Sequence, residues 1–357
     1  MPQHPALFRA EAFCQAQNVR LPILLAPMAG ACPPALSAAV ANAGGFGACG
    51  ALLMGPDAIG QWASAFRAAS NGEFQINLWA PDPPPARDKA AEAALRVFLS
   101  AWGPSVPEDA ADATPPDFAA QCEAVLAARP AIASSIMGLY PPDFVARLHA
   151  AGIKWFATVT TVAEARAAEA AGADAIIAQG TEAGGHRGAF AAGRAEQAAV
   201  GLFALLPAVC DAVRLPVIAT GGIADARGIA AALLLGASAV QIGTAFLRCP
   251  EAGLAPAWAD ALAQAQPEDT MLTRAFSGRA GRSLATEYVR AAATPDAPSP
   301  APYPVQRGLT QAMRTQAAQM NDLDRMQAWA GQAARLAPAR PAGEVAQAWW
   351  AEAQALL

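Results

Sequence analysis

Residues 175–188 read Ala175-Ile176-Ile177-Ala178-Gln179-Gly180-Thr181-Glu182-Ala183-Gly184-Gly185-His186-Arg187-Gly188, a short apolar run followed by a glycine-rich loop that holds one of only three histidines. The apolar run predicts a buried strand, and the glycines predict a loop that leaves its end. A glycine has no side chain to keep a flat or phosphorylated ligand away from backbone amides, so this loop favours ligand binding. His186 is a candidate proton acceptor there, because an unperturbed imidazole titrates near neutral pH.

Similar apolar runs recur along the chain, and most are followed by a turn and an alanine-rich segment with the length of a helix. Alternating strands and helices imply parallel pairing, and eight strands imply closure into an α/β fold of the (β/α)8 TIM-barrel type. The predicted strands cover residues 23–26, 45–48, 74–78, 131–134, 155–158, 175–178, 217–220 and 239–242. The clearest helices cover residues 34–43, 142–151, 161–171 and 225–235, and a glycine that can end the helix follows each of them.

The alternation of predicted strands and helices stops after Arg248. This predicts a barrel domain, residues 1–250, and an added C-terminal helical region, residues 251–357, that caps the substrate site. Helices are expected near residues 311–336 and 343–357. The tryptophans expected to anchor these helices are Trp329, Trp349 and Trp350.

A second addition interrupts the barrel pattern after the third predicted strand. Residues 80–116 are rich in proline and acidic residues, and one helix near residues 86–99 is expected within them. We interpret this segment as an excursion that covers the mouth of the barrel.

Three further loops follow predicted strands, at the end of the barrel where such enzymes assemble their sites. Pro27-Met28-Ala29-Gly30 forms a turn whose backbone can lie along a planar ring. Gly221-Gly222 precedes a helix whose N-terminus can hold a phosphate. Gln241-Ile242-Gly243-Thr244 completes the same anion site with amides and a hydroxyl group.

The hexapeptide Gly45-Phe46-Gly47-Ala48-Cys49-Gly50 matches the dinucleotide-binding pattern G-x-G-x-x-G, but its context argues against such a site. A true fingerprint follows a strand and opens a helix. Here a predicted helix precedes the glycines, and they run into a strand.

Composition narrows the possible partners and compartment. The formal net charge of -5 provides no basic face for nucleic acid. The longest apolar runs are far shorter than the ~20 residues of a membrane helix, and charged or polar residues interrupt the start of the chain. We therefore expect no nucleic-acid partner, no membrane segment, no signal peptide and a cytoplasmic location. The six cysteines are widely spaced with no C-x-x-C pair, which predicts no metal site and small core residues instead.

Together the quoted motifs resemble the nitronate monooxygenases, formerly called 2-nitropropane dioxygenases. The resemblance rests on Pro27 to Gly30, Gln75-Ile76-Asn77-Leu78, Gln179 to Gly188, Gly221-Gly222-Ile223 and Gln241 to Thr244. It runs from about Leu21 to Leu247 and continues more loosely through Ser277-Gly278-Arg279 and Trp329-Ala330-Gly331-Gln332. The resemblance implies a TIM barrel that holds FMN noncovalently, with His186 at the catalytic position. The implied flavin contacts are Pro27, Met28, Ala29, Asn77, Gln179, Gly184, Gly185, Gly221, Gly222, Gln241, Ile242, Gly243 and Thr244.

The implied reaction is oxidation of alkyl nitronates, and of nitroalkanes after loss of a proton, with O2 to a carbonyl compound and nitrite. This sequence departs from the family pattern at two places. Ser135-Ile136-Met137 stands where many members carry an aromatic residue and a histidine, so a more apolar pocket wall at Ile136 and Met137 is expected. Ala280 stands where a proline is usual, and Gly281 follows it.

Two other functions remain open from the sequence. The same barrel could carry an NAD(P)H-dependent flavin reductase of a quinone or an enoyl thioester. It could also carry a non-redox lyase or isomerase that holds a phosphorylated ligand in the glycine-lined site. The natural substrate and the oligomeric state stay open.

Overall fold

Eight parallel strands form a barrel, which confirms the fold predicted from the alternation of apolar runs and alanine-rich segments. The computed structural model describes residues 4–357. The strands pair in the order β1-β9-β8-β6-β5-β4-β3-β2, and a parallel bridge between Leu24 and Phe46 joins the two ends of the sheet. The strands are β1 (Ile23–Leu25), β2 (Gly47–Gly50), β3 (Phe74–Trp79), β4 (Ile132–Ile136), β5 (Lys154–Val159), β6 (Ala175–Gln179), β8 (Val217–Thr220) and β9 (Ala239–Ile242).

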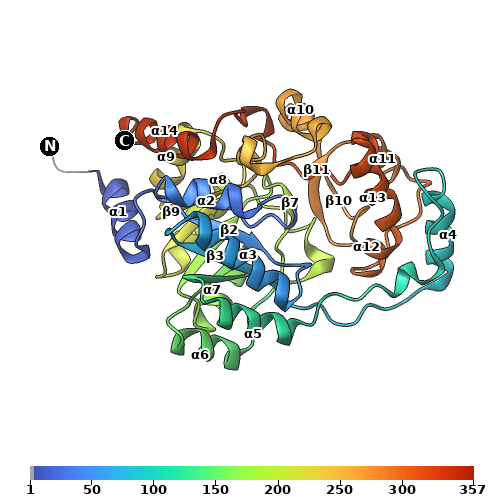
Figure 1. The fold of residues 1–357 in the computed structure, drawn as a ribbon, viewed down its shortest axis with the longest axis horizontal. Helices are drawn as coiled ribbons and strands as arrows, with labels where there is room; N and C mark the ends of the chain where they lie inside the picture. The colour runs from blue at the N-terminus through green and yellow to red at the C-terminus, as the bar shows by residue number, and fades with distance from the viewer. Residues whose placement is uncertain (1–3) are drawn as a thin grey trace.

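Helices cover the outside of the barrel, and the C-terminal helix takes the last place in this layer (Figure 1). α14 (Ala342–Ala355) packs against both α9 (Ala226–Leu234) and α2 (Pro34–Asn42). Trp349 and Trp350 are buried in α14, as expected for residues that anchor a helix. The other helices between the strands are α3 (Pro56–Ala69), α5 (Phe118–Ala128), α6 (Pro142–Ala150), α7 (Val162–Ala170) and α8 (Leu202–Ala212).

The end of the barrel where the strands begin is filled by α1 (Pro5–Gln17), a helix that the sequence analysis did not predict. Phe13 of α1 packs with Leu24, Phe46 and Phe156 in one buried cluster. The rings of Phe13 and Phe156 lie 6.4 Å apart. A ligand site therefore belongs at the opposite end, where the strands finish.

Two segments far apart in the sequence pack together beside that opposite end, and they are referred to below as the cap module (residues 80–113 and 270–331). Figure 1 shows α4 (Lys89–Leu99) next to α12 (Val305–Leu309) and α13 (Gln311–Met320). α4 confirms the helix expected near residues 86–99. The core that the two segments share consists of Leu95, Leu99, Ala111, Ala275, Phe276, Tyr288, Val289, Ala301, Val305, Leu309 and Met313.

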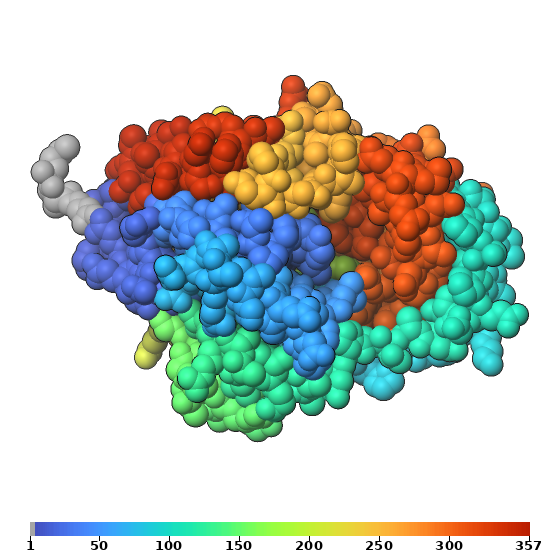
Figure 2. Space-filling view, in the orientation of Figure 1, coloured from blue at the N-terminus to red at the C-terminus, as the bar shows by residue number. Residues whose placement is uncertain are grey.

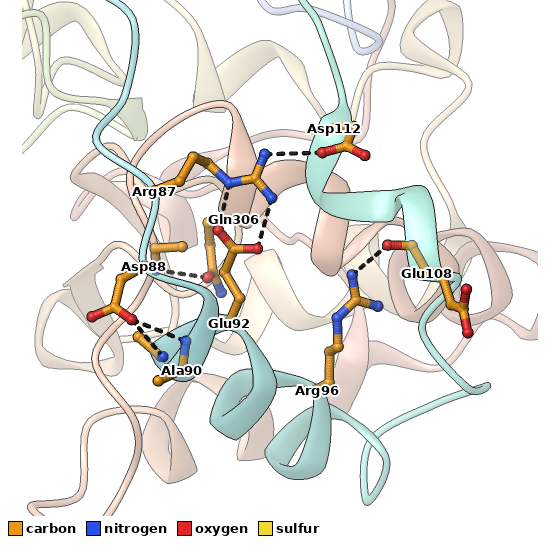
Figure 3. Close-up of polar contacts among 10 residues, drawn as sticks. Arg87, Asp88, Ala90, Glu92, Arg96, Glu108, Asp112 and Gln306 are labelled. Carbon is orange, nitrogen blue, oxygen red and sulfur yellow. Dashed lines mark hydrogen bonds and ion pairs between the residues drawn. The ribbon is translucent and has the colours of Figure 1, made fainter.

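Polar side chains hold the first segment of the cap module in place (Figure 3). The Arg87 guanidinium donates to both carboxylate oxygens of Glu92 and to Asp112 at 2.9 Å. Asp112 belongs to the 3-10 helix η1 (Glu108–Asp112). Arg87 therefore ties the start of α4 to the end of the segment.

The cap module also contains strands that the sequence analysis did not predict. β10 (Thr270–Thr273) and β11 (Gly281–Leu284) form an antiparallel hairpin. β11 also pairs with β7, which consists of Gly185 and His186. The predicted helix near residues 311–336 ends at Met320, and short 3-10 turns follow. The remaining helices are α10 (Pro256–Gln264), α11 (Glu287–Ala291) and the 3-10 helices η2 (Ala192–Arg194), η3 (Thr244–Phe246), η4 (Pro250–Ala252), η5 (Pro267–Asp269), η6 (Leu323–Arg325) and η7 (Ala334–Leu336).

Substitution of Gly308 by alanine tests how closely the two segments of the cap module pack. A Cβ at Gly308 would lie 1.9 Å from the carbonyl oxygen of Ala110, so the segments would have to separate. We expect Gly308→Ala to lower the free energy of unfolding by about 1–3 kcal/mol in denaturant titrations. The matched control is Gly60→Ala in α3, where a Cβ meets no atom within 4 Å. The control should raise the free energy of unfolding by about 0.5–1 kcal/mol, and equal effects of the two changes would contradict the packing.

Candidate active site

A cavity of about 1440 Å³, including the space at its mouth, lies where the strands of the barrel end. Figure 2 shows a hollow between the blue N-terminal segments and the orange C-terminal segments. His186 and all but one of the predicted cofactor-binding residues line the cavity, namely Pro27, Met28, Ala29, Asn77, Gln179, Gly184, Gly185, Gly221, Gly222, Gln241, Gly243 and Thr244. Loops predicted from four separate parts of the sequence therefore meet in one place.

Two residues singled out in the sequence lie outside this cavity. Ile242 ends β9 with its side chain in the buried layer between the strands and the surrounding helices, and its carbonyl oxygen accepts a hydrogen bond from the Ala26 amide at 2.8 Å. Met137 is buried elsewhere, so the expectation that it forms part of the pocket wall is wrong. Ile136 does line the cavity and makes that wall apolar.

Backbone pairing and one side-chain amide place His186 at the cavity. In the pairing of β7 with β11, His186 lies opposite Gly281. At the end of β6, Nε2 of Gln179 donates to the His186 carbonyl oxygen at 3.0 Å, and Oε1 accepts from the Gly188 amide at 2.8 Å. Gln179 therefore holds the turn that carries His186 as well as lining the cavity.

The His186 ring contacts two tryptophans and one serine. Its centroid lies 4.8 Å from that of Trp79 and 4.8 Å from that of Trp329. Nε2 shares a hydrogen bond of 2.7 Å with Oγ of Ser277. Within residues 4–357, Nδ1 has no hydrogen-bond partner, so it is the ring nitrogen available to a ligand.

Burial lowers the pKa of His186 to about 3, and the nearby positive charges of Arg307, Arg279 and Arg314 add to this effect. The ring is therefore neutral at physiological pH. Arg279 is itself fixed, because its guanidinium forms two hydrogen bonds with the Asp82 carboxylate and is only 1% exposed. This ion pair joins the two segments of the cap module next to the cavity.

The loops after β8 and β9 present backbone amides to the cavity. Within the described residues, the N–H groups of Gly222, Gly243 and Thr244 donate no hydrogen bond. Gly221 and Gly222 have φ values of 113° and 69°, which favour glycine and turn the backbone at this point. Free amides at the ends of the last two barrel strands fit the phosphate of FMN.

Close packing around Gly184 leaves no room for a side chain on the loop next to these amides. A Cβ at Gly184 would lie 2.5 Å from the Gly331 nitrogen and 2.8 Å from Thr244 Oγ1. The Gly331 amide donates to the same Thr244 oxygen at 3.0 Å. The cap module therefore contacts the predicted cofactor site directly through its own backbone.

Several residues that line the cavity escaped the sequence analysis: Trp79, Trp258, Arg307, Gln327 and Trp329. Trp329 was expected to anchor a C-terminal helix, and this is wrong because its ring contacts His186 at the cavity. Four of these residues come from the segment after Arg248, where neither glycine loops nor apolar periodicity indicate a site. Only Trp79 follows a predicted strand.

Within residues 4–357, no group of three or more His, Cys, Asp or Glu side chains is arranged to hold a metal ion. All six cysteines are free, and five of them are buried. No helix in that range is long and apolar enough to cross a membrane.

The sequence model of the nitronate monooxygenases matches residues 11–349. The chain belongs to the nitronate monooxygenase family. Members of this family are flavin-dependent oxidoreductases, so the protein is an enzyme. A nitronate monooxygenase of Paraburkholderia phytofirmans is 41% identical over 91% of this chain and 90% of its own length. One from Pseudomonas aeruginosa is 38% identical over 94% of this chain and 97% of its own length.

Solved structures extend the likeness to the whole fold of this nitronate monooxygenase family member. A nitroalkane oxidase from Streptomyces ansochromogenes superimposes with a TM-score of 0.86 at 38% identity and covers 97% of this chain and 99% of its own. FabK from Thermotoga maritima superimposes with a TM-score of 0.75 at 28% identity and covers 97% of this chain and 96% of its own.

The low pKa of His186 predicts how the stability of the apoprotein depends on pH. The unfolded chain binds a proton at His186 near its ordinary pKa of 6.5, whereas the folded protein does so only near 3. The unfolded state therefore holds more protons between these values, and stability falls as the pH decreases through this window. We expect His186→Gln to make the fall in unfolding free energy between about pH 7 and pH 4 shallower, as measured in denaturant. An unchanged slope would show that His186 titrates normally in the folded protein.

Proposed function

We propose that this enzyme uses FMN to oxidise alkyl nitronates with O2 to a carbonyl compound and nitrite. The observation that carries the proposal is the position of a neutral His186 in a cavity that also exposes the free amides of Gly222, Gly243 and Thr244. Membership of the nitronate monooxygenase family supports the same reaction. The reaction balances for two nitronates and one O2, which give two carbonyl compounds and two nitrite ions. In each nitronate the carbon–nitrogen bond breaks, a carbon–oxygen bond forms and two electrons are lost, while the O–O bond breaks and O2 takes up the four electrons.

Different residues of the cavity would bind FMN and position His186. The amides after β8 and β9 would hold the phosphate of FMN, and the backbone of Pro27, Met28 and Ala29 would lie along the flavin ring. Bound FMN supplies the electron-accepting group and the reaction with O2. Trp79 and Trp329 pack against the imidazole and fix its position at the cavity.

The electrostatics of His186 favour a substrate that is already an anion. A nitronate has lost its α-proton, whereas a neutral nitroalkane must give that proton to a base. Because burial and three arginines lower the pKa of His186, the imidazole is free to accept a proton but is a weak base. For a nitronate, Nδ1 of His186 needs only to orient the substrate.

Anaerobic mixing of the FMN-loaded protein with ethyl nitronate and, separately, with NADPH tests the proposed function. We expect a rapid change of flavin absorbance with the nitronate, little change with NADPH, and nitrite release once O2 is admitted. Fast loss of flavin absorbance with NADPH alone would assign the protein to the flavin reductases. A protein that gains no flavin on incubation with FMN would point to the non-redox alternative.

The variant His186→Asn tests whether His186 is the base, because nitroethane must lose a proton before oxidation and ethyl nitronate need not. Loss of a general base typically lowers a rate by ~10² to 10⁴, so turnover of nitroethane should fall by that factor. Turnover of ethyl nitronate should fall much less, because no proton has to leave its carbon. The flavin content of the variant is the control, and equal losses on both substrates would refute the assignment of His186 as the base.

A further inference from the structure

Arg307 brings a positive charge to the cavity without a negative partner. It lies in α12 of the cap module and lines the same cavity as His186. Within residues 4–357, its guanidinium forms no ion pair and no hydrogen bond. An unpaired charge that is partly removed from water is costly, so its position calls for an explanation by function.

The groups around Arg307 do not neutralise it. Tyr303, Arg314 and His186 are the titratable neighbours that influence its charge or are influenced by it, and none of them is a carboxylate. Burial lowers the pKa of Arg307, and burial together with Arg307 lowers that of Arg314 to about 9. The Arg314 guanidinium donates hydrogen bonds inside the cap module, to Thr310 Oγ1 at 3.1 Å and to the Arg307 carbonyl oxygen at 2.8 Å.

Gln327 adds a second unused donor to the cavity. Its Oε1 accepts from Arg314 at 3.2 Å, which fixes the orientation of the amide. Its Nε2 is buried and has no hydrogen-bond partner in the described structure, and the residue lines the cavity. A buried donor without an acceptor is rare in native proteins and calls for a partner that the described residues do not supply.

We propose that Arg307 and Gln327 bind the two oxygens of the nitronate group and thereby make the enzyme select the anion over the neutral nitroalkane. A nitronate carries its negative charge on two coplanar oxygens, which matches the geometry of a guanidinium. The charge-assisted hydrogen bond exists for the anion alone, so it discriminates between two substrates with the same carbon skeleton. This inference rests on the proposed function and adds its binding site for the reacting group.

Kinetics of Arg307→Gln with ethyl nitronate and with nitroethane test the selection. Loss of a charge-assisted hydrogen bond should raise KM for ethyl nitronate by about 10- to 100-fold and leave KM for nitroethane within about 3-fold. Arg307→Lys keeps the charge and should recover part of the affinity. Arg335→Gln, which removes a charge from an exposed site, is the matched control and should leave both values unchanged. Equal changes on both substrates, or none with ethyl nitronate, would overturn the proposal.

Binding of propionate gives a readout that does not depend on turnover. Propionate has the shape and charge of ethyl nitronate, and propionamide has a similar shape without charge. Propionate should raise the thermal midpoint of the unmodified protein, with and without FMN, and propionamide should not. Arg307→Gln should weaken propionate binding by about 10- to 100-fold.

The two experiments separate the site from the reaction. A protein that binds propionate through Arg307 but does not oxidise ethyl nitronate would refute the proposed function and leave the anion site standing. If Arg307→Gln oxidises ethyl nitronate with the KM of the unmodified protein, the anion site is refuted and the proposed function stands. If Arg307→Gln does not fold, Gln327→Leu replaces it, and an unchanged affinity for propionate in that variant would overturn the role of Gln327.

Discussion

The pairing of a two-residue strand with the cap module is the contact on which the cavity depends. β7 holds Gly185 and His186, and its bonds to β11 join a loop of the barrel to residues almost a hundred positions later. The same pairing brings Trp329 against Gly281, where a Cβ would lie 3.0 Å from two atoms of the indole ring. The position of His186, the wall beside it and the attachment of the cap module therefore follow from one short ladder of backbone hydrogen bonds.

The barrel and its glycine loops could be predicted because their signals are local. Most strands contain a short apolar run, and several of the helices between them are followed by a glycine, such as Gly44 and Gly172, both of which have positive φ. The alternation of side chains along a strand also explains the placement of Ile242: its neighbour Gln241 points into the barrel and lines the cavity, so Ile242 must point outward.

The other half of the site could not be predicted, because it depends on contacts between distant segments. Arg307 and Trp329 reach the cavity through the packing of the cap module. No local pattern of glycines or apolar residues indicates that position, and the loose resemblance around Trp329 gives no role for its ring. The effect of Arg307 and Trp329 is electrostatic as well as steric. The chain is acidic as a whole, yet the described residues around His186 include three arginines, of which Arg279 is paired with a carboxylate.

The division of the cap module into two segments has a consequence for biosynthesis. Residues 80–113 leave the ribosome long before residues 270–331, and the apolar side chains of α4 gain their partners only when α12 and α13 arrive. Until then Leu95 and Leu99 belong to an unfinished core, which is the kind of surface that chaperones recognise. The layer of helices around the barrel is also completed late, because α14, which packs against α2 and α9, is near the C-terminal end of the chain. We therefore expect the native state to form only after most of the chain has been made.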